Sequence, residues 1–365
     1  GEAGAAVFAF QRVLAIEPNF AGARLELARS YFEMGQMQSA QREFLVLQNQ
    51  SPPQHVSDVI DKYMAAIESR SLQNRRGWRG FLQFGVGDDS NVNNATSADS
   101  FLGFDLSDDS RETSSSVIST MGGASYDLPF NIDSKFFFKA SINHRANNDA
   151  SYTSTVNYDG LMGYSKSFSS SDLSLAMQFY TADVDGEFNN KGIHLTTQYT
   201  LNFSPANQMG LFLRGGNVDY DSEFDVKDID QILYGVSWAH VFSGESRVSM
   251  VLAAIAGEDT PVDESSPYGR DFSGLRLSAS YPFTHRFNVY FSLGATDSDY
   301  TGTFFNNTQA RVDSQSDIVF GANWRINKTW MLNAVIGKTD NSSNIEIFDY
   351  QKNIIMFTAR SEFTP

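Results

Sequence analysis

The sequence predicts two parts of different class: a set of N-terminal helical repeats, then a roughly 14-stranded antiparallel β-barrel of the outer-membrane type. Residues 1–74 have the apolar spacing of amphipathic helices. Residues 75–365 hold segments of roughly ten residues in which apolar and polar side chains alternate. The connections between these segments are alternately short and long. We therefore expect two domains, with residues 1–74 in the periplasm and residues 75–365 in the outer membrane.

Helical periodicity predicts four helices, at residues 3–16, 20–34, 37–50 and 54–70. Three pairs of residues recur at a spacing of 34: Ala6 and Ala40, Phe10 and Phe44, and Pro18 and Pro52. This spacing, with small residues where helices touch and Pro after the second helix, resembles the tetratricopeptide repeat. The first copy begins midway along the motif, so we expect the repeat domain to be truncated at its start.

The concave face of such a repeat array binds extended or helical peptides. Here that face would carry the candidate client-binding residues Glu26, Arg29, Phe32 and Glu33. The same four side chains would also suit a helix face that contacts only water. The sequence leaves both interpretations open.

The segment at residues 191–204 is typical of the expected barrel wall. Ile193 and Leu195 alternate with His194 and Thr196. Since successive side chains of a strand point to opposite faces, one face of this wall would be dry and the other wet. A soluble β-sandwich also alternates, but its strands are typically shorter and its dry face less aromatic. The sequence therefore favours a membrane barrel.

Alternation and turn residues together predict about fourteen strands, an even number, as single-chain bacterial barrels have. They are expected near 79–88, 114–128, 134–146, 152–167, 172–183, 191–204, 208–219, 229–242, 246–257, 271–282, 286–297, 312–325, 329–339 and 351–363. Long connections are expected at 89–113, 184–190, 220–228, 258–270, 298–311 and 340–350. Because long loops of such barrels face outward, both ends of the barrel sequence are expected on the periplasmic side.

Composition and charge exclude several function classes. The chain has no cysteine, which excludes disulfides, cysteine-bound zinc and a thiol nucleophile. Its net charge of −16 argues against a nucleic-acid partner, because phosphate binding needs clustered Lys and Arg. No apolar stretch approaches the ~20 residues of a membrane helix. No secretory signal peptide is visible, so we expect residue 1 to follow a processing or trimming point.

No pattern of catalytic or metal-binding residues stands out, and we expect neither an enzyme nor a resident metal or cofactor. The five histidines are scattered without metal-ligand spacing. Two acidic clusters, at 183–187 and 219–230, have carboxylates at alternate positions that could hold Ca²⁺, but neither completes an EF-hand loop. Acidic loops that contact only water are the favoured interpretation.

Six polar residues are expected on inward faces of strands, where they would line the lumen: Lys139, His194, Arg214, Arg276, Arg325 and Arg360. The five cations among them could select an anionic passenger. They could equally pair with Asp or Glu in a structural network, which is the interpretation slightly favoured here.

The repeats, the first strand GWRGFLQFGVG and the segment DDSNVNNAT at Asp88–Thr96 resemble the surface lipoprotein assembly modulator family, also called type XI secretion. The resemblance includes a Ser-Asn-x-Asn stretch after the first strand, carried here by Asp89, Ser90, Asn91 and Asn93. It implies periplasmic repeats that bind a lipoprotein or secreted-protein client, and a fourteen-stranded barrel that helps the client across the outer membrane.

The chain departs from that family in its short repeat region and its acidic loops, so other functions stay open. A polysaccharide exporter would join repeats that hold a synthase to a barrel that conducts a charged polymer. A passive porin with a periplasmic anchor is a third interpretation.

Other partners follow from the barrel itself. We expect outer-membrane lipid and lipopolysaccharide around it. The last strand ends at the aromatic Phe363 and resembles the signal read by the barrel assembly machinery. For a folded lipoprotein, our hypothesis is a transient opening between the first and last strands.

Overall fold

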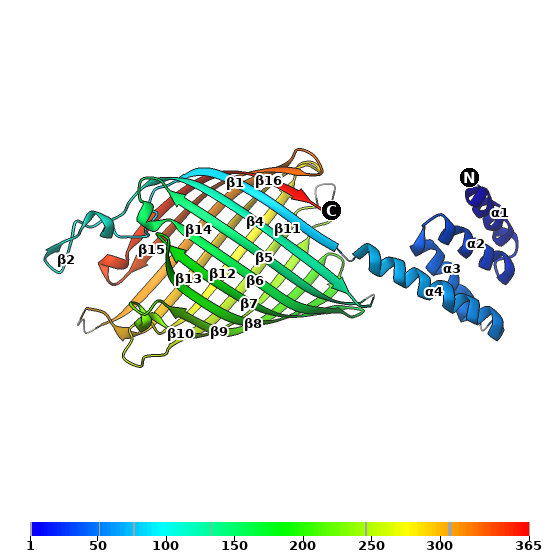
Figure 1. The fold of residues 1–365 in the computed structure, drawn as a ribbon, viewed down its shortest axis with the longest axis horizontal. Coiled ribbons are helices and arrows are strands. Elements are labelled where there is room, and N and C mark those ends of the chain that lie inside the picture. Colours follow the sequence, from blue (N-terminus) through cyan, green and yellow to red (C-terminus); the bar gives the residue numbers. More distant parts are fainter. Residues whose placement is uncertain are drawn as a thin grey trace. The chain divides into compact units, whose positions relative to one another are not determined.

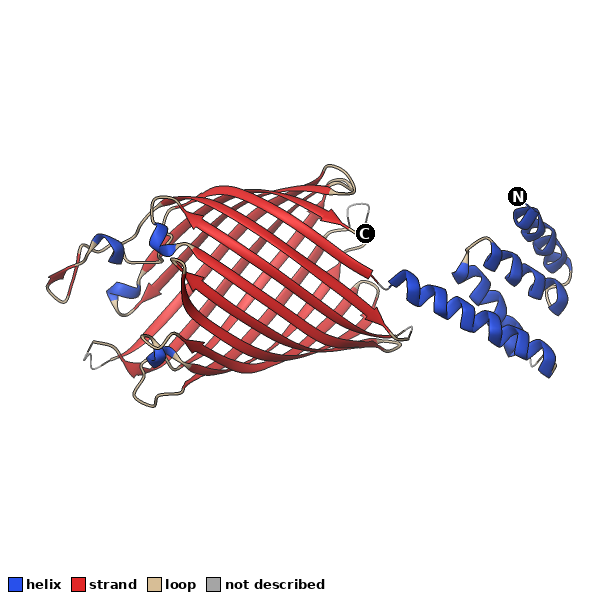
Figure 2. Ribbon diagram, in the orientation of Figure 1, coloured by secondary structure: helices blue, strands red, loops and turns tan. Residues whose placement is uncertain are grey.

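The computed structural model describes residues 2–50, 52–75, 77–131, 133–244, 247–305 and 309–364. The chain divides into two compact units: Gly1–Gly77 with Leu128–Ser134, and Trp78–Asp127 with Lys135–Pro365. The first unit holds the helices and the second holds most of a closed β-barrel (Figure 1 and Figure 2).

Four helices make up the N-terminal part that the structure describes: α1 (Glu2–Ile16), α2 (Ala21–Glu33), α3 (Met37–Asn49) and α4 (Gln54–Arg75). They confirm the four predicted helices, although α4 continues beyond the predicted end at residue 70. No helix within the described residues is both long and apolar enough to cross a membrane.

The helices pack through a core of small and large apolar side chains. Ala28 on α2 and Ala40 on α3 are fully buried members of this core. Phe44 on α3 is also fully buried and stacks on the Tyr63 ring of α4, with ring centroids 5.1 Å apart. The core therefore joins α2, α3 and α4 into one body, with small residues at the close approaches as the repeat pattern predicts.

The turn after α2 depends on a glycine. Gly35 has a φ of +75°, which side-chain-bearing residues adopt only with strain. Its N–H donates to the Phe32 carbonyl at 3.0 Å, and the Gln36 N–H donates to the Tyr31 carbonyl at 2.9 Å. These two bonds form a Schellman motif, which satisfies carbonyls at the end of α2 and directs the chain into α3.

Fourteen strands in the described part of the chain close into an antiparallel barrel, which confirms the predicted count. Consecutive strands are neighbours, and β1 closes the barrel by lying between β16 and β4. The wall strands are β1 (Gly77–Asp89), β4 (Ser115–Pro129), β5 (Ser134–Asn147), β6 (Thr155–Ser167), β7 (Ser171–Val184), β8 (Glu187–Ser204), β9 (Asn207–Tyr220), β10 (Ile229–Val241), β11 (Ser249–Pro261), β12 (Arg270–Pro282), β13 (Phe287–Thr303), β14 (Ala310–Arg325), β15 (Trp330–Ser343) and β16 (Tyr350–Phe363).

The connections between the wall strands form two groups, one at each end of the barrel. We call these ends the short-turn end and the long-loop end. β1 begins and β16 ends at the short-turn end, where Gly80 lies opposite Phe363. A separate two-stranded sheet, β2 (Ser100–Phe101) with β3 (Phe104–Asp105), lies in the long loop after β1 and was not predicted. Short 3-10 helices also occur in the long loops: η1 (Asp108–Ser110), η2 (Ser151–Thr153), η3 (Asp225–Lys227) and η4 (Glu346–Phe348).

One predicted long loop, at 184–190, is wrong. β7 and β8 are joined by only Asp185 and Gly186, with φ values of +53° and +81°. Positive φ at both central residues is the type I′ hairpin turn, for which Asp-Gly is a preferred sequence. The acidic composition of this segment suggested a loop, but the Asp185-Gly186 dipeptide is the stronger indicator, and it indicates a hairpin turn.

Several strands extend further than predicted at the long-loop end. β13 continues to Thr303 and β11 to Pro261, although polar and acidic residues there suggested loops. Polar side chains are compatible with strand pairing where both faces of the wall contact water. β6 instead starts late, at Thr155, because residues 151–153 form the 3-10 helix η2.

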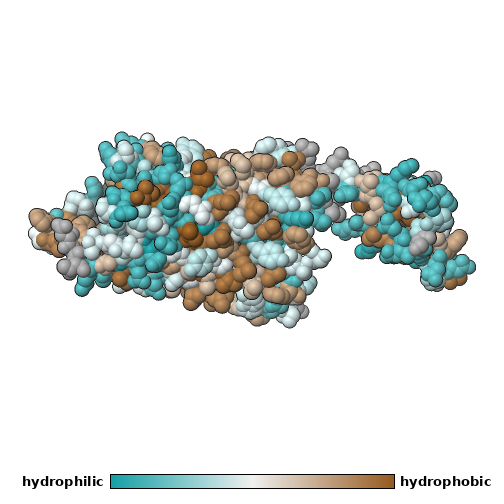
Figure 3. Space-filling view, turned by 90° about the horizontal axis from the view of Figure 1, so that it is seen from below, coloured by the Kyte–Doolittle hydropathy of each residue, from teal (hydrophilic) through white to brown (hydrophobic). Residues whose placement is uncertain are grey.

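Apolar side chains cover the outside of the barrel around its middle. Ile193 and Leu195 are 47% and 56% exposed, whereas His194 between them is 3% exposed. In Figure 3, hydrophobic residues gather over the middle of the barrel and hydrophilic residues over the long-loop end. The rings of Trp78 and Tyr126 contact each other on the outer face, with centroids 4.8 Å apart and an interplanar angle of 36°. This distribution suits a wall in contact with hydrocarbon, flanked by aromatic rings.

Phe44→Ala should lower the free energy of unfolding of the helical unit by about 3–5 kcal/mol, because it leaves a cavity beside Tyr63 and Ile60. The measurement is urea unfolding of the full chain in detergent, followed by its helical circular dichroism signal. Leu45→Ala, at a side chain that is 42% exposed, is the matched control and should cost less than about 1 kcal/mol. Equal losses in the two variants would contradict the core described above.

Candidate functional site

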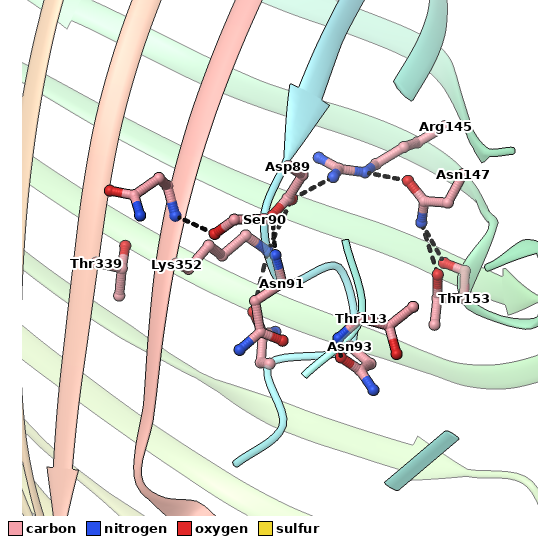
Figure 4. Close-up of polar contacts among 12 residues, drawn as sticks. Asp89, Ser90, Asn91, Asn93, Thr113, Arg145, Asn147, Thr153, Thr339 and Lys352 are labelled. Atoms are coloured by element: carbon pink, nitrogen blue, oxygen red, sulfur yellow. Dashed lines mark hydrogen bonds and ion pairs between the residues drawn. The ribbon is translucent and has the colours of Figure 1, made fainter. Parts of the chain in front are cut away.

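The motif Asp89–Asn93 lies where β1 reaches the long-loop end, inside a network of polar contacts (Figure 4). Asp89 is 1% exposed. Its carboxylate accepts a hydrogen bond from Arg145 of β5 and forms an ion pair with Lys352 of β16 at 3.0 Å. A buried carboxylate requires such partners because removing a charge from water is costly. Asp89 therefore links β1 to its neighbour β16 and, beyond β4, to β5.

Ser90 and Asn91 continue the pairing of β1 with β16 beyond the barrel wall. The Ser90 N–H donates to the Asn353 carbonyl, and the Ser90 hydroxyl accepts from the Asn353 N–H, both at 2.9 Å. Asn91 is fully buried, and its Nδ2 donates to the carbonyls of Gln351 at 3.0 Å and Ala95 at 2.8 Å. These bonds hold the start of the long loop against the last strand.

Asn93 fastens the two arms of the same loop. Its Nδ2 donates to the Arg111 carbonyl at 2.6 Å, and its Oδ1 accepts from the Thr113 N–H at 3.1 Å. Residues 90–113 thus leave and return to the wall through hydrogen bonds made by the motif. The motif works as a structural brace at the long-loop end, and we call Asp89, Ser90, Asn91 and Asn93 the brace.

Sequence reasoning missed the partners of the brace. Arg145 also donates to Asn147 Oδ1 at 3.1 Å, and Asn147 Nδ2 donates to Thr153 Oγ1 at 2.8 Å, so the network reaches η2. Asp89 is on the inward face of β1, because the side chains of Leu82, Phe84 and Val86 alternate with it and are exposed on the outside. A carboxylate on the inward face of a strand implies a cationic partner. The sequence does not show which strand carries that partner.

The seam between β1 and β16 is closed along its length. Ten residue pairs run from Gly80–Phe363 to Asp89–Ile354. A Cβ on Gly80 would lie 2.3 Å from the Phe363 ring, so a larger residue there would require this ring to move. The Phe363 ring of the last strand therefore packs directly over Gly80 of the first strand.

The six residues predicted to line the lumen lie on six different strands, and most have polar or aromatic neighbours. Arg214 Nη2 donates to Gln231 Oε1 at 2.6 Å. Arg276 lies 4.0 Å from Asp317, measured from Nη2 to Oδ2. The remaining contacts are Arg325 with Glu362 at 3.7 Å, Arg360 with Glu362 at 3.1 Å, and Lys139 Nζ over the Phe137 ring at 5.7 Å.

His194 differs from the others. It stacks on Tyr180 with ring centroids 5.5 Å apart, and neither ring nitrogen has a hydrogen-bond partner among the described residues. Gly216 lies opposite it, and a Cβ there would be 2.6 Å from the imidazole ring. Packing against Tyr180 and the bare backbone of β9 therefore accounts for its burial.

Of the four predicted client-binding residues, some contact the helical core and others are exposed to solvent. Phe32 packs against the helical core, with its ring edge-on to Tyr63 at 5.2 Å. Arg29 pairs with Glu26 at 2.9 Å and donates to Tyr63 Oη at 3.0 Å, and hydrogen bonding to Tyr63 and Glu26 raises the pKa of the Arg29 guanidinium. Glu33 is exposed. Client binding by these residues stays a prediction.

The acidic loop residues are satisfied locally in several places. Asp228 accepts a hydrogen bond from the Tyr220 N–H at 2.7 Å, and Asn217 donates to Asp219 at 2.8 Å. Among the described residues, no group of three or more His, Asp or Glu side chains is placed to hold a metal ion.

Residues 1–59 match the family model described as tetratricopeptide repeat, which confirms the repeat predicted from the 34-residue spacing. The match covers part of the chain only and does not extend into the barrel. No curated protein matches the sequence.

Several solved structures are similar to the chain in fold. Outer-membrane-expressed OmpT of Vibrio cholerae has 9% identity and a TM-score of 0.49, with 79% of this chain and 97% of that chain covered. OprD of Pseudomonas aeruginosa has 8% identity and a TM-score of 0.41, with 80% and 96% covered. A bacterial polysaccharide outer membrane secretin has 8% identity and a TM-score of 0.39, with 77% and 97% covered. At these values the likeness does not extend to function.

Asp89→Ala should destabilise the barrel by about 3 kcal/mol, because Arg145 and Lys352 then lose their shared partner. The measurement is the temperature at which the detergent-solubilised barrel unfolds, together with amide exchange in residues 90–113, which should become faster. Asp88→Ala is the matched control, since Asp88 is exposed on the outer face. Unchanged exchange in the Asp89 variant would rule out the brace.

Proposed function

We propose that this protein is an outer-membrane translocon or assembly factor that helps a lipoprotein or secreted protein to cross the outer membrane. This is the role implied by the resemblance to the surface lipoprotein assembly modulator family. In it, the repeats bind the client in the periplasm and the barrel assists passage. The observation that carries the proposal is the presence of tetratricopeptide-repeat helices and a closed fourteen-stranded barrel in one chain.

The barrel surface supports the proposed location. Its exposed apolar side chains need hydrocarbon around them, and closed barrels are the strand-built structures that can span a membrane. The short-turn end would then face the periplasm, which is the side on which an N-terminal repeat domain would meet clients.

The repeat helices support a role in holding a client. A binding unit attached to a pore raises the local concentration of its ligand, so even weak binding favours delivery. Arg29, Glu26 and Glu33 offer charged groups on α2. Arg29 is held in place by Tyr63, which lowers the entropy cost of using it in binding.

The seam is the part of the wall that we propose to open for a folded client. At the long-loop end it is held by the brace as well as by strand pairing. At the short-turn end, the Arg360 guanidinium lies 3.7 Å from the centre of the Phe81 ring across the seam, whereas Glu362 pairs with Arg360 of its own strand and with Arg325 of β14. Opening would therefore begin at the short-turn end and use the brace as its hinge.

A disulfide across the seam should abolish client display. Leu82 and Ser361 lie directly opposite each other, and the chain has no cysteine of its own, so Leu82→Cys with Ser361→Cys creates one defined pair. Surface display of a lipoprotein client should be lost under oxidation and restored by reductant.

The matched control places the same crosslink within the wall, with Leu175→Cys and Thr197→Cys on β7 and β8. This control should display its client under both conditions. Undiminished display with the seam locked would remove the opening hypothesis.

Planar-bilayer recordings distinguish assisted export from a passive porin. We expect the purified full chain to conduct ions only in brief events. A steady open conductance would favour the porin interpretation instead.

A further inference from the structure

A pocket of about 510 Å³ lies in the barrel at the short-turn end, beside the seam. Its lining includes Arg79 and Phe81 of β1, Lys139 of β5, Lys328 of the turn after β14, and Arg360 of β16. These residues come from distant parts of the sequence and meet only because the barrel closes.

Cations outnumber carboxylates around this pocket. Six cationic side chains and two carboxylates lie in or beside it: Arg79, Lys135, Lys139, Arg325, Lys328 and Arg360, with Asp127 and Glu362. Asp127 is shared by Arg79 at 2.5 Å and Lys135 at 3.1 Å, and Glu362 is shared by Arg325 and Arg360. No carboxylate within the described ranges lies at ion-pairing distance from Lys139 or Lys328.

Two inward arginines at the long-loop end are each matched by one carboxylate. Arg270 pairs with Asp259 at 2.7 Å, and Arg311 pairs with Asp313. Arg145 and Lys352, at the same end, share Asp89. The pocket cations without a carboxylate partner among the described residues, Lys139 and Lys328, therefore lie at the short-turn end of a chain whose net charge is −16.

Such a cluster is unfavourable without an anion. Like charges in a partly enclosed cavity repel one another more strongly than in bulk water, because the local dielectric is lower. A bound carboxylate relieves this repulsion, and the guanidinium of Arg79 or Arg360 can donate two parallel hydrogen bonds to it. Phe81 and Met121 add apolar surface to the same lining.

We propose that this pocket binds a carboxylate-rich segment of the client polypeptide as the client enters the barrel. This inference rests on the proposed function and names the chemistry that the barrel recognises. Peptide is favoured over an acidic glycan because the cations alternate with apolar side chains, which matches the acidic and apolar side chains of a polypeptide. The repeat helices of the same chain also belong to a class that binds peptides.

The test is fluorescence anisotropy with the full chain in detergent. The probe is a labelled peptide of alternating Glu and Leu, compared with the same peptide carrying Gln in place of Glu. The Glu peptide should bind more tightly, and added salt should weaken its binding, since exposed charge interactions are screened. The double variant Lys139→Gln with Lys328→Gln should bind the Glu peptide about tenfold more weakly.

The matched control removes the same charge from elsewhere on the barrel. Lys166 and Lys191 are exposed, and their places in the alternation put them on the outer face with Tyr164 and Ile193. Lys166→Gln with Lys191→Gln should bind like the parent chain. Both double variants should keep the unfolding temperature of the parent, which shows that the barrel is intact.

Two outcomes would overturn the proposal: equal binding of the Glu and Gln peptides, or equal loss of binding in the two double variants. Displacement of the peptide by an oligoglucuronate that binds more tightly would overturn the assignment to polypeptide. Client display reports on the proposed function separately, so a chain that displays its client but ignores the Glu peptide refutes this inference alone.

Discussion

A sheet surrounded by hydrocarbon must close on itself, because an unpaired edge strand would leave N–H and C=O groups without partners. In this chain, closure of the barrel depends on the pairing of β1 with β16. These two strands are separated by almost the whole barrel sequence. The other wall pairs join successive strands of the wall. The seam is therefore the contact with the largest loss of chain entropy, and the brace and the pocket both lie beside it.

The sequence predicted the wall well because alternation is a local property. Side-chain period sets which face is apolar, and turn residues mark where each strand stops, so the fourteen strands followed from short windows of sequence. The brace did not follow, because Arg145 lies 56 residues from Asp89 and Asn353 lies 263 residues from Ser90. The alternation of side chains predicts that Asp89 points inward. The residues that pair with Asp89 depend on the stagger between strands, and a short segment of sequence does not specify this stagger.

The helical unit shows the same division between local and distant information. The 34-residue period predicted its helices and its core, including Ala40 and Phe44. The 34-residue period did not predict which side chains pack in the core and which remain available to bind a ligand. Phe32 and Arg29 both contact Tyr63 on α4, and Tyr63 is 34 residues after Arg29. A residue on the inner face of one helix can serve either purpose, and the choice depends on how closely α4 approaches.

Paired and unpaired cations are distributed unevenly between the two ends of the lumen. A carboxylate-rich segment entering at the short-turn end would meet the cations that are least neutralised, whereas Arg270 and Arg311 further along already have carboxylate partners. Binding would therefore be stronger at entry than at Arg270 and Arg311 beyond it, so a captured segment is not held again by these two arginines. The acidic loops at the far end disfavour return of an anionic segment once it has left. Capture and release can thus follow from the same distribution of charge.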